Sequence, residues 1–256
     1  MIITDSFVYL NFPKTGSSFV RKVLRELHRK QAPVPFWQFW KSQRAMEEFE
    51  APNLRIAAGP RRGAPTPHGC RWQIPEAASG LPVVSGVRDP FERAWSAYRY
   101  ADWKKPEALL APESEIREAF PNFPELGFPE FLAYQNAFPP RRLQVGDRDC
   151  GSMTTAFVYF FLDEPPEDQE HLSFDTVDEV RDSINGVDYL PCEELNGALT
   201  EFLSRFGYSG EELDHVLHRD PVNVAGKKEI DPEREEVRAQ VTESEWLFYE
   251  LFPRYQ

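Results

Sequence analysis

The sequence predicts an α/β fold built around a parallel β-sheet. Candidate strands and helices alternate along its 256 residues, which is the pattern of successive βαβ units. The candidate strands are short and almost continuously apolar, as expected for strands that are covered on both faces. No internal repeat and no Ser/Gly-rich linker interrupts the chain. We therefore expect one domain that covers residues 1–256.

The first strand, loop and helix are expected near the N-terminus. Residues 6–12, SFVYLNF, form a β-rich and mostly apolar run. From Ser17 onward, apolar side chains recur at helical spacing, and basic residues fall largely between them. These apolar residues are Phe19, Val20, Val23, Leu24 and Leu27. The spacing predicts a strand, a tight loop and then an amphipathic helix.

Three further segments follow before the next clear motif. Residues 34–50 are rich in aromatic side chains and predict a helix. Residues 53–59, NLRIAAG, predict a second, short strand. Residues 60–69 are rich in Pro and Gly, which is typical of a loop.

A second strand and helix are expected around Arg88. Residues 81–90, LPVVSGVRDP, predict a buried strand that ends near Arg88. Asp89 can cap the following helix, and Pro90 suits the first helical position. We expect this helix to cover residues 90–103.

The second half of the chain carries weaker patterns. Residues 104–140, rich in Pro and Phe, indicate loops and short helices, and residues 152–162, SMTTAFVYFFL, suit either a buried helix or a strand. Residues 187–208 predict a strand followed by a helix over residues 193–206. Residues 231–255 predict one or two helices.

The composition excludes several classes of protein. A net charge of −13 argues against a general nucleic-acid-binding protein, although it allows a local basic pocket. Three widely spaced cysteines form neither a CxxC pair nor a disulfide framework, so a reducing compartment is favoured. The first residues do not resemble a signal peptide, and the longest apolar run, residues 156–162, is too short to span a membrane. We expect a cytoplasmic protein; its oligomeric state is open.

The turn PKTGSS, residues 13–18, has the chemistry of an anion-binding loop. Amide groups at a helix start are unpaired, and Gly16 allows the backbone to approach a ligand closely. Ser17 and Ser18 add hydroxyl donors, and Lys14 adds a positive charge. The Walker pattern GxxxxGK[ST] is absent, because Lys14 precedes the glycine. The alternative is that Gly16 merely eases a turn and a serine caps a helix.

A second candidate anion site follows the strand that ends near Arg88. Ser96 comes eight residues later, on the predicted helix. Ligands of open α/β sheets bind at the carboxyl ends of the strands, so Arg88 and Ser96 could hold a second phosphate there. The structural alternative makes Ser96 a small packing residue. For Arg93, on the same helix, we favour a surface charge without a role in the site.

These two motifs, PKTGSS and, some seventy residues later, RDPFERAWSAY, resemble those of the sulfotransferases that use 3'-phosphoadenosine 5'-phosphosulfate (PAPS). The chain is most similar to their carbohydrate and heparan-sulfate-like branch, including bacterial members. The resemblance implies a P-loop-like, three-layer fold with a central parallel sheet flanked by helices. It also implies the product 3',5'-ADP.

The resemblance assigns the binding residues as well. The 5'-phosphosulfate is expected to lie on the first loop, formed by Lys14, Thr15, Gly16, Ser17 and Ser18. Arg88 and Ser96 are expected to bind the 3'-phosphate. In the late stretch VNVAGKK, Lys227 or Lys228 could close over the cofactor, the alternative being two exposed lysines on a solvated loop.

Sulfuryl transfer needs an in-line acceptor oxygen, a stabilised leaving group and a general base. Lys14 is the candidate that stabilises the leaving oxygen. No cluster of metal ligands is evident in the sequence, and we expect no metal. His68 is the candidate base, since it alone among the five histidines lies in a loop between the two motifs, and some relatives carry a base histidine at similar spacing. The alternatives are three carboxylates, Glu47, Glu48 and Glu50.

The acceptor is open: a glycan, a lipid-linked sugar, a phenol or a small alcohol. Four aromatic residues could line an acceptor site or belong to the core: Trp37, Phe39, Trp40 and Trp72. Arg61 and Arg62 could steer an anionic acceptor or be solvated. Two rival functions remain, a P-loop-like nucleotide kinase and a catalytically silent protein that only binds PAPS.

Overall fold

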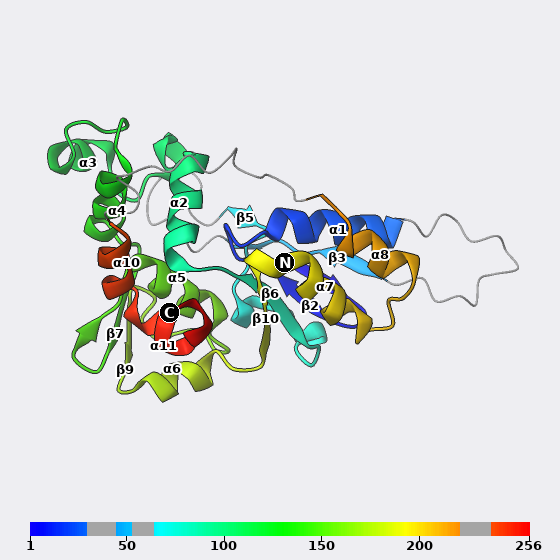
Figure 1. Cartoon of the computed structure of the whole chain (residues 1–256). Helices are drawn as coiled ribbons and strands as arrows, with labels where there is room; N and C mark the ends of the chain where they lie inside the picture. The colour runs from blue at the N-terminus through cyan, green and yellow to red at the C-terminus, as the bar shows by residue number, and fades with distance from the viewer. Residues whose placement is uncertain (30–44, 53–63, 221–236) are drawn as a thin grey trace, which may run out of the picture.

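The computed structural model describes residues 1–29, 45–52, 64–220 and 237–256 (Figure 1). The largest described sheet has five strands, in the order β10 (Val187–Pro191), β6 (Val83–Val87), β2 (Val8–Leu10), β1 (Ile2–Thr4) and β3 (Met46–Glu48). Strands β10, β6 and β2 run parallel, whereas β1 is antiparallel to β2 and to β3. The central sheet is therefore mixed.

The expected all-parallel sheet is wrong at the edge formed by β1 and β3. A tight turn joins β1 to β2, in which the Thr4 hydroxyl donates to the Phe7 carbonyl (2.8 Å) and accepts from the Phe7 amide (2.9 Å). This turn reverses the chain within a few residues, so the two strands can only pair antiparallel. The sequence does not predict β1, because its apolar run is too short to be distinctive.

Helices cover both faces of the central sheet, as expected for a layered α/β fold (Figure 1). One face packs against α1 (Ser17–Arg29), α7 (Leu195–Ser204) and α8 (Glu211–Leu217). The other packs against α5 (Ser152–Phe161), α6 (Val177–Ser183) and α11 (Trp246–Leu251). Along β2, Tyr9 points into the first core, while Val8 and Leu10 point into the second. This alternation is the period of two of a strand buried on both faces.

A third apolar cluster lies beside the sheet and is built mainly from aromatic rings. It joins α2 (Pro90–Tyr100), α3 (Glu113–Ala119), α4 (Phe128–Ala137) and α10 (Arg238–Ser244). In Figure 1 these helices lie to the left of the sheet, with α2 facing it. Because α2 follows β6 directly, this cluster holds the helix that carries the second sequence motif.

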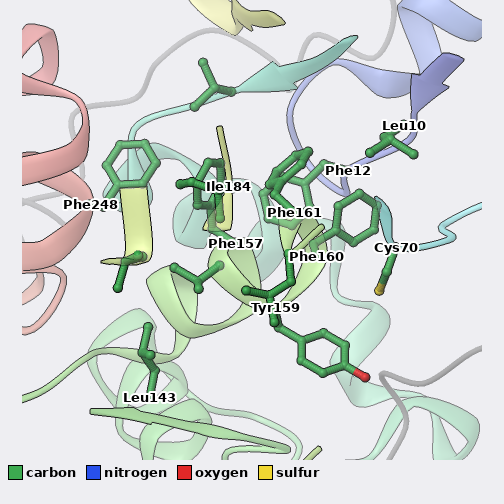
Figure 2. Packing of buried hydrophobic residues seen from close by; sticks show 14 of the residues in the cluster. Leu10, Phe12, Cys70, Leu143, Phe157, Tyr159, Phe160, Phe161, Ile184 and Phe248 are labelled. Atoms are coloured by element: carbon green, nitrogen blue, oxygen red, sulfur yellow. The ribbon is translucent and has the colours of Figure 1, made fainter. Parts of the chain in front are cut away.

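Phe12, at the end of β2, is anchored among the rings of α5 (Figure 2). Its ring centroid lies 5.7, 4.9 and 5.2 Å from those of Phe157, Phe160 and Phe161, respectively. This helix resolves the ambiguity of residues 152–162 in favour of a helix, since its bulky rings fill the core around the end of β2. The residue that immediately precedes the candidate anion loop is therefore fixed by the core.

Most of the predicted elements that fall in the described residues are confirmed. Strands β2, β6 and β10 lie within their predicted ranges. Helix α1 begins at Ser17, as predicted, and α7 lies within two residues of its predicted range at each end. Asp89 caps α2 by accepting a hydrogen bond from the Glu92 amide (2.9 Å), with Pro90 at the first helical position. The helix ends three residues earlier than expected, because Ala101 adopts a left-handed conformation with φ 55°.

The predicted helix over residues 34–50 is wrong where it is described, because Met46–Glu48 forms the edge strand β3. Pairing with β1 outweighs local helix preference there. Residues 30–44 and the predicted strand over residues 53–59 lie outside the described residues. Of the predicted loop, residues 64–69 are described, and they contain the short strand β5.

The remaining described elements are short. Strands β4 (Ala51–Pro52) and β5 (Pro65–Thr66) pair with each other, and a second small sheet holds β8 (Arg148–Asp149), β7 (Arg142–Val145) and β9 (His171–Phe174). Six single 3-10 turns are described: η2 (Arg71–Gln73), η3 (Glu76–Ala78), η4 (Asp102–Lys104), η5 (Pro106–Ala108), η6 (Cys192–Glu194) and η7 (Pro253–Tyr255). No helix among the described residues is long and apolar enough to cross a membrane. The extent of the domain over residues 1–256 stays a prediction.

Candidate functional site

The loop between β2 and α1 is held in shape by its backbone. Lys14 and Gly16 have positive φ angles of 68° and 80°. Between them, Thr15 is fully buried, and its hydroxyl donates a hydrogen bond to the Phe12 carbonyl (2.8 Å). The Gly16 carbonyl then accepts from the Phe19 amide (2.9 Å), which begins α1. The loop is therefore a rigid connection. The left-handed backbone conformation of Lys14 and Gly16 sets the direction in which α1 begins.

Two glycines allow this loop to lie against its neighbours. A Cβ atom on Gly86, in β6, would be 2.3 Å from the Thr15 carbonyl oxygen. A Cβ atom on Gly16 would be 2.4 Å from Cδ2 of Leu195, at the start of α7. Neither separation is sterically possible without movement. The sequence motif contains Gly16 but not Gly86, although a lone glycine inside an apolar strand is itself a sign of a close backbone approach.

The two serines of the motif occupy different environments at the start of α1. Ser17 is nearly buried, with 7% of its surface exposed, whereas Ser18 is exposed. In an α-helix the first amide groups have no acceptor within the helix, so those of Ser17 and Ser18 can donate to a ligand. The partial positive charge of the helix start adds to this preference for an anion.

Lys14 and Arg88 are brought together across the ends of β2 and β6. Nη1 of Arg88 donates to the Lys14 carbonyl oxygen (3.4 Å). Nζ of Lys14 lies 3.7 Å from the ring centroid of Tyr100, which is 63% exposed. Burial and the nearby Arg88 charge lower the pKa of Lys14 to about 8, against a smaller opposing effect of Asp102. Lys14 and Arg88 therefore lie next to each other at the carboxyl ends of the neighbouring parallel strands β2 and β6.

Ser96 lies on the face of α2 that is directed toward these cations. Glu92, Ser96 and Tyr100 are spaced four residues apart, so they line one side of the helix. Glu92 is 3.8 Å from Arg88, and Tyr100 contacts Lys14, so both neighbours of Ser96 on this face reach the site. The residues of the two sequence motifs thus come together in the fold.

His68 is held at the carboxyl end of β2. Its Nδ1 lies 2.6 Å from the Asn11 carbonyl oxygen, while the Asn11 side-chain amide donates to the Pro67 carbonyl (3.0 Å). A carbonyl oxygen can only accept, so Nδ1 carries the hydrogen, and in the neutral ring the basic lone pair is on Nε2. Asn11 is three positions before Lys14, which puts His68 next to the loop in the fold. Sequence reasoning did not identify Asn11, because its partners are more than fifty residues away.

The carboxylate alternatives are less suited to act as a base. Glu48 forms ion pairs with Arg21 and Arg25, and hydrogen bonding from Arg25 is the main cause that lowers its pKa to about 2. A carboxylate so stabilised in its charged form accepts a proton poorly near neutral pH. Glu47 and Glu50 are exposed on or beside the edge strand β3.

Trp72 and Arg93 belong to the core. Trp72 is partly buried and packs edge-to-face on Tyr159, with ring centroids 6.3 Å apart. Arg93 is only 5% exposed, so the expectation of a surface charge is wrong. Its guanidinium donates to the Met153 carbonyl (2.8 Å) and lies 4.2 Å from the Phe12 ring centroid. It therefore ties α2 to the helix that anchors the end of β2.

A buried carboxylate elsewhere has a structural explanation. Glu245 is 3% exposed and accepts hydrogen bonds from the amides of Met153 (3.1 Å) and Thr154 (2.6 Å). It thereby satisfies unpaired amides at the start of α5. Burial raises its pKa. We assign it no part in the candidate site.

Several candidate residues cannot be placed. The late lysines, three of the aromatic acceptor candidates and two loop arginines lie outside the described residues: Lys227, Lys228, Trp37, Phe39, Trp40, Arg61 and Arg62. Across the described ranges, His, Cys, Asp and Glu side chains form no group of three that could hold a metal ion.

Comparison with known proteins gives no match: neither a family model, nor a curated protein, nor a solved structure is similar to this chain. Function is therefore inferred from the residues of the site.

Proposed function

We propose that this protein is a PAPS-dependent sulfotransferase, which transfers a sulfuryl group from PAPS to an acceptor hydroxyl. The observation that carries the proposal is the contact between the two motifs. Lys14 and Arg88 are seventy-four residues apart in sequence, yet Arg88 donates to the Lys14 carbonyl where β2 and β6 end. A nucleotide with anionic groups on both sides of its ribose needs two such sites close together.

The arrangement of the first loop supports a P-loop-like fold around this site. Parallel strands β2 and β6 end side by side, and each is followed by a helix whose start faces the same edge of the sheet. Ligands of open α/β sheets occupy this edge. The amides at the start of α1 and the charge of Lys14 suit the 5'-phosphosulfate, and Arg88 with Ser96 suits the 3'-phosphate.

In the proposed reaction, His68 removes the proton of the acceptor hydroxyl through Nε2. The acceptor oxygen forms a bond to sulfur as the bond between sulfur and the bridging phosphate oxygen breaks. Lys14 stabilises the negative charge that develops on this leaving oxygen, and 3',5'-ADP departs. Asn11 keeps the imidazole oriented, because its carbonyl accepts the Nδ1 hydrogen. None of the three cysteines forms a disulfide, which fits the cytoplasmic location predicted from the sequence.

Nucleotide binding gives the first test, since it does not require the acceptor to be known. We expect 3',5'-ADP to bind in isothermal titration calorimetry, and ATP not to compete with it. ATP binding without 3',5'-ADP binding would reject the proposal in favour of a nucleotide kinase. Transfer of label from radioactive PAPS to a panel of glycans, phenols and alcohols then tests catalysis. Binding without transfer to any acceptor would favour a silent PAPS-binding protein.

His68→Ala tests the assignment of the base. We expect turnover to fall at least ~100-fold, while the affinity for 3',5'-ADP is nearly unchanged, because the imidazole acts on the acceptor. His171→Ala is a matched control, since that histidine is exposed on β9 and pairs with Asp168. Unaltered turnover in His68→Ala would reject its role as the base.

A further inference from the structure

The ring of Tyr100 lies against the amine of Lys14 in the candidate anion loop. Nζ of Lys14 is 3.7 Å from the ring centroid, well inside the ~6 Å over which an aromatic face attracts a cation. Of the described residues, Tyr100 and Leu217 are the large apolar side chains that are exposed, and Tyr100 is the more exposed of the two. Packing in a core therefore does not explain where this ring lies.

The backbone on both sides of this contact is fixed independently of it. Tyr100 is the last residue of α2, which ends because Ala101 has a left-handed conformation. Trp103 then enters the third apolar cluster, and its indole nitrogen donates to a carbonyl of α2 (3.2 Å). On the other side, the Lys14 carbonyl accepts from Arg88 (3.4 Å). The contact therefore joins two side chains that start from defined positions.

The charges near the Lys14 amine have opposing effects on it. Burial and Arg88, at the end of β6, act against the charged form and lower the pKa of Lys14 to about 8. Asp102, in η4, has the opposite and smaller effect, and its carboxylate also pairs with the Lys105 amine (2.6 Å). The Lys105 amine is itself 5.9 Å from the Tyr100 ring centroid. Lys14 therefore titrates close to neutral pH, where any contact that favours its charge changes how much of the protein carries that charge.

A ring holds this amine in a different way from a carboxylate. An ion pair would neutralise the amine, and its carboxylate would compete with an incoming anion. The face of a tyrosine ring attracts an ammonium but has no net charge, so the positive charge stays available to a ligand. A lysine ammonium has three N–H donors, and those directed away from the ring can donate to an oxyanion. Tyr100 can therefore hold Lys14 in place without blocking it.

We propose that Tyr100 is a positioning residue of the candidate site, whose ring holds the Lys14 ammonium at the anion loop and stabilises it in the charged form. Tyr100 lies two residues beyond the second sequence motif, which ends at Tyr98. The inference rests on the proposed function in one respect, because the anion that would meet this ammonium is the 5'-phosphosulfate. The contact itself involves no nucleotide, so it can be tested without one.

The first test follows the titration of Lys14 by NMR in protein labelled with carbon-13 at the lysine ε position. The signal is assigned through its loss in Lys14→Arg. In the wild type we expect the ring current of Tyr100 to shift the ε-methylene protons upfield. In Tyr100→Leu we expect this shift to disappear and the titration midpoint to fall by ~0.5 pH unit, because leucine still excludes water but has no aromatic face. Tyr100→Phe should restore both values, since it keeps the ring.

Trp246→Leu is the matched control for this titration. It removes a similar contact elsewhere, in which the Arg148 guanidinium carbon lies 3.9 Å from the Trp246 ring centroid, and it should leave the Lys14 signal unchanged. Tyr100→Met gives the same comparison if Tyr100→Leu does not fold. A midpoint that is unchanged or higher in the aliphatic variants would overturn the proposal, as would a wild-type Lys14 signal without the upfield shift.

The second test measures what the contact does for anion binding. Calorimetry compares the affinity of the wild type and of Tyr100→Leu for 3',5'-ADP at about pH 7 and pH 9. We expect the loss of affinity in the variant to be ~2- to 3-fold larger at the higher pH, where fewer of its Lys14 amines are charged. A merely structural role of Tyr100 would weaken binding by the same factor at both pH values.

The outcomes distinguish the inference from the proposed function. If 3',5'-ADP does not bind to the wild type while the NMR titration behaves as expected, the proposed function fails and the positioning of Lys14 by Tyr100 stands. If 3',5'-ADP binds and the loss in Tyr100→Leu is the same at both pH values, the inference alone is overturned.

Discussion

The two candidate anion sites lie side by side but are built in different ways. The loop of residues 13–18 is shaped by its backbone, with Thr15 fully buried and glycines at both close approaches. The site around Arg88 is made of partly exposed side chains, with Nη2 of Arg88 3.8 Å from Oε2 of Glu92. Binding by backbone amides is fixed by the fold, whereas binding by side chains can be adjusted residue by residue. Substitutions should therefore act abruptly at the first site and gradually at the second.

The largest effect is expected from Gly86→Ala. The new Cβ atom would lie 2.3 Å from the Thr15 carbonyl oxygen, so the loop must move away from β6. We expect the free energy of unfolding to fall by ~1–3 kcal/mol and 3',5'-ADP binding to be lost. Chemical denaturation and calorimetry measure the two effects. Gly80→Ala is the control, since a Cβ atom there meets open space. Normal binding in Gly86→Ala would mean that the loop has more freedom than its packing indicates.

Arg88→Lys should have a smaller and selective effect. Lysine keeps the charge but loses the planar pair of donors that suits a phosphate. We expect ~10-fold weaker binding of 3',5'-ADP and little change for 5'-AMP, measured by calorimetry. An equal loss for both nucleotides would show that Arg88 acts by supporting the Lys14 carbonyl instead.

The pH dependence of binding should report on Lys14. Burial and Arg88 lower its pKa to about 8 in the free protein, so the amine loses its charge as the pH rises through 8. A bound anion favours the charged amine, and the affinity for 3',5'-ADP should therefore decrease ~3- to 10-fold between about pH 7.5 and 9. Lys14→Arg stays charged in this range and should flatten the profile. A profile that is equally steep in Lys14→Arg would assign the titration to another group.

The contribution of Lys14 to folding stability changes with pH in the opposite direction to its contribution to binding. An unfolded lysine keeps its usual pKa of 10.5, above the lowered folded value, so between the two the unfolded state binds more protons. The Lys14 contribution to stability therefore increases as the pH rises from 8 to 10.5.

The smallest effect is expected from Ser96→Ala. One hydroxyl donor is removed from a partly exposed helix face, which weakens 3',5'-ADP binding by ~1 kcal/mol, or about 5-fold. Displacement of a fluorescent nucleotide is sensitive enough to measure it. A loss as large as that of Gly86→Ala would contradict the contrast between the two sites.

Local patterns in the sequence predict the parts of the site that are themselves local. The apolar runs before Lys14 and Arg88, the amphipathic spacing after Ser17 and the capping pair Asp89 and Pro90 each act within a single strand or helix. These features predicted β2, α1, β6 and α2, and the candidate residues of the first loop with them.

The other parts depend on contacts between distant segments. Gly86 is recognisable as part of the site only because Thr15 packs against it in the fold. The Asn11 contact with His68 likewise joins separate segments. No spacing rule links residues so far apart in a single sequence. The antiparallel edge of the sheet was missed for a different reason, because β1 and β3 have three residues each, which are too few to show a strand period.

The burial of Thr15 has a consequence for how the loop moves. Its hydroxyl holds the Phe12 carbonyl, and the Phe12 ring is surrounded by Phe157, Phe160 and Phe161. The loop therefore cannot open without disturbing the core, and its backbone should stay ordered for as long as the packing around α5 persists. Such a loop is already ordered before a ligand arrives, so association loses little conformational entropy there.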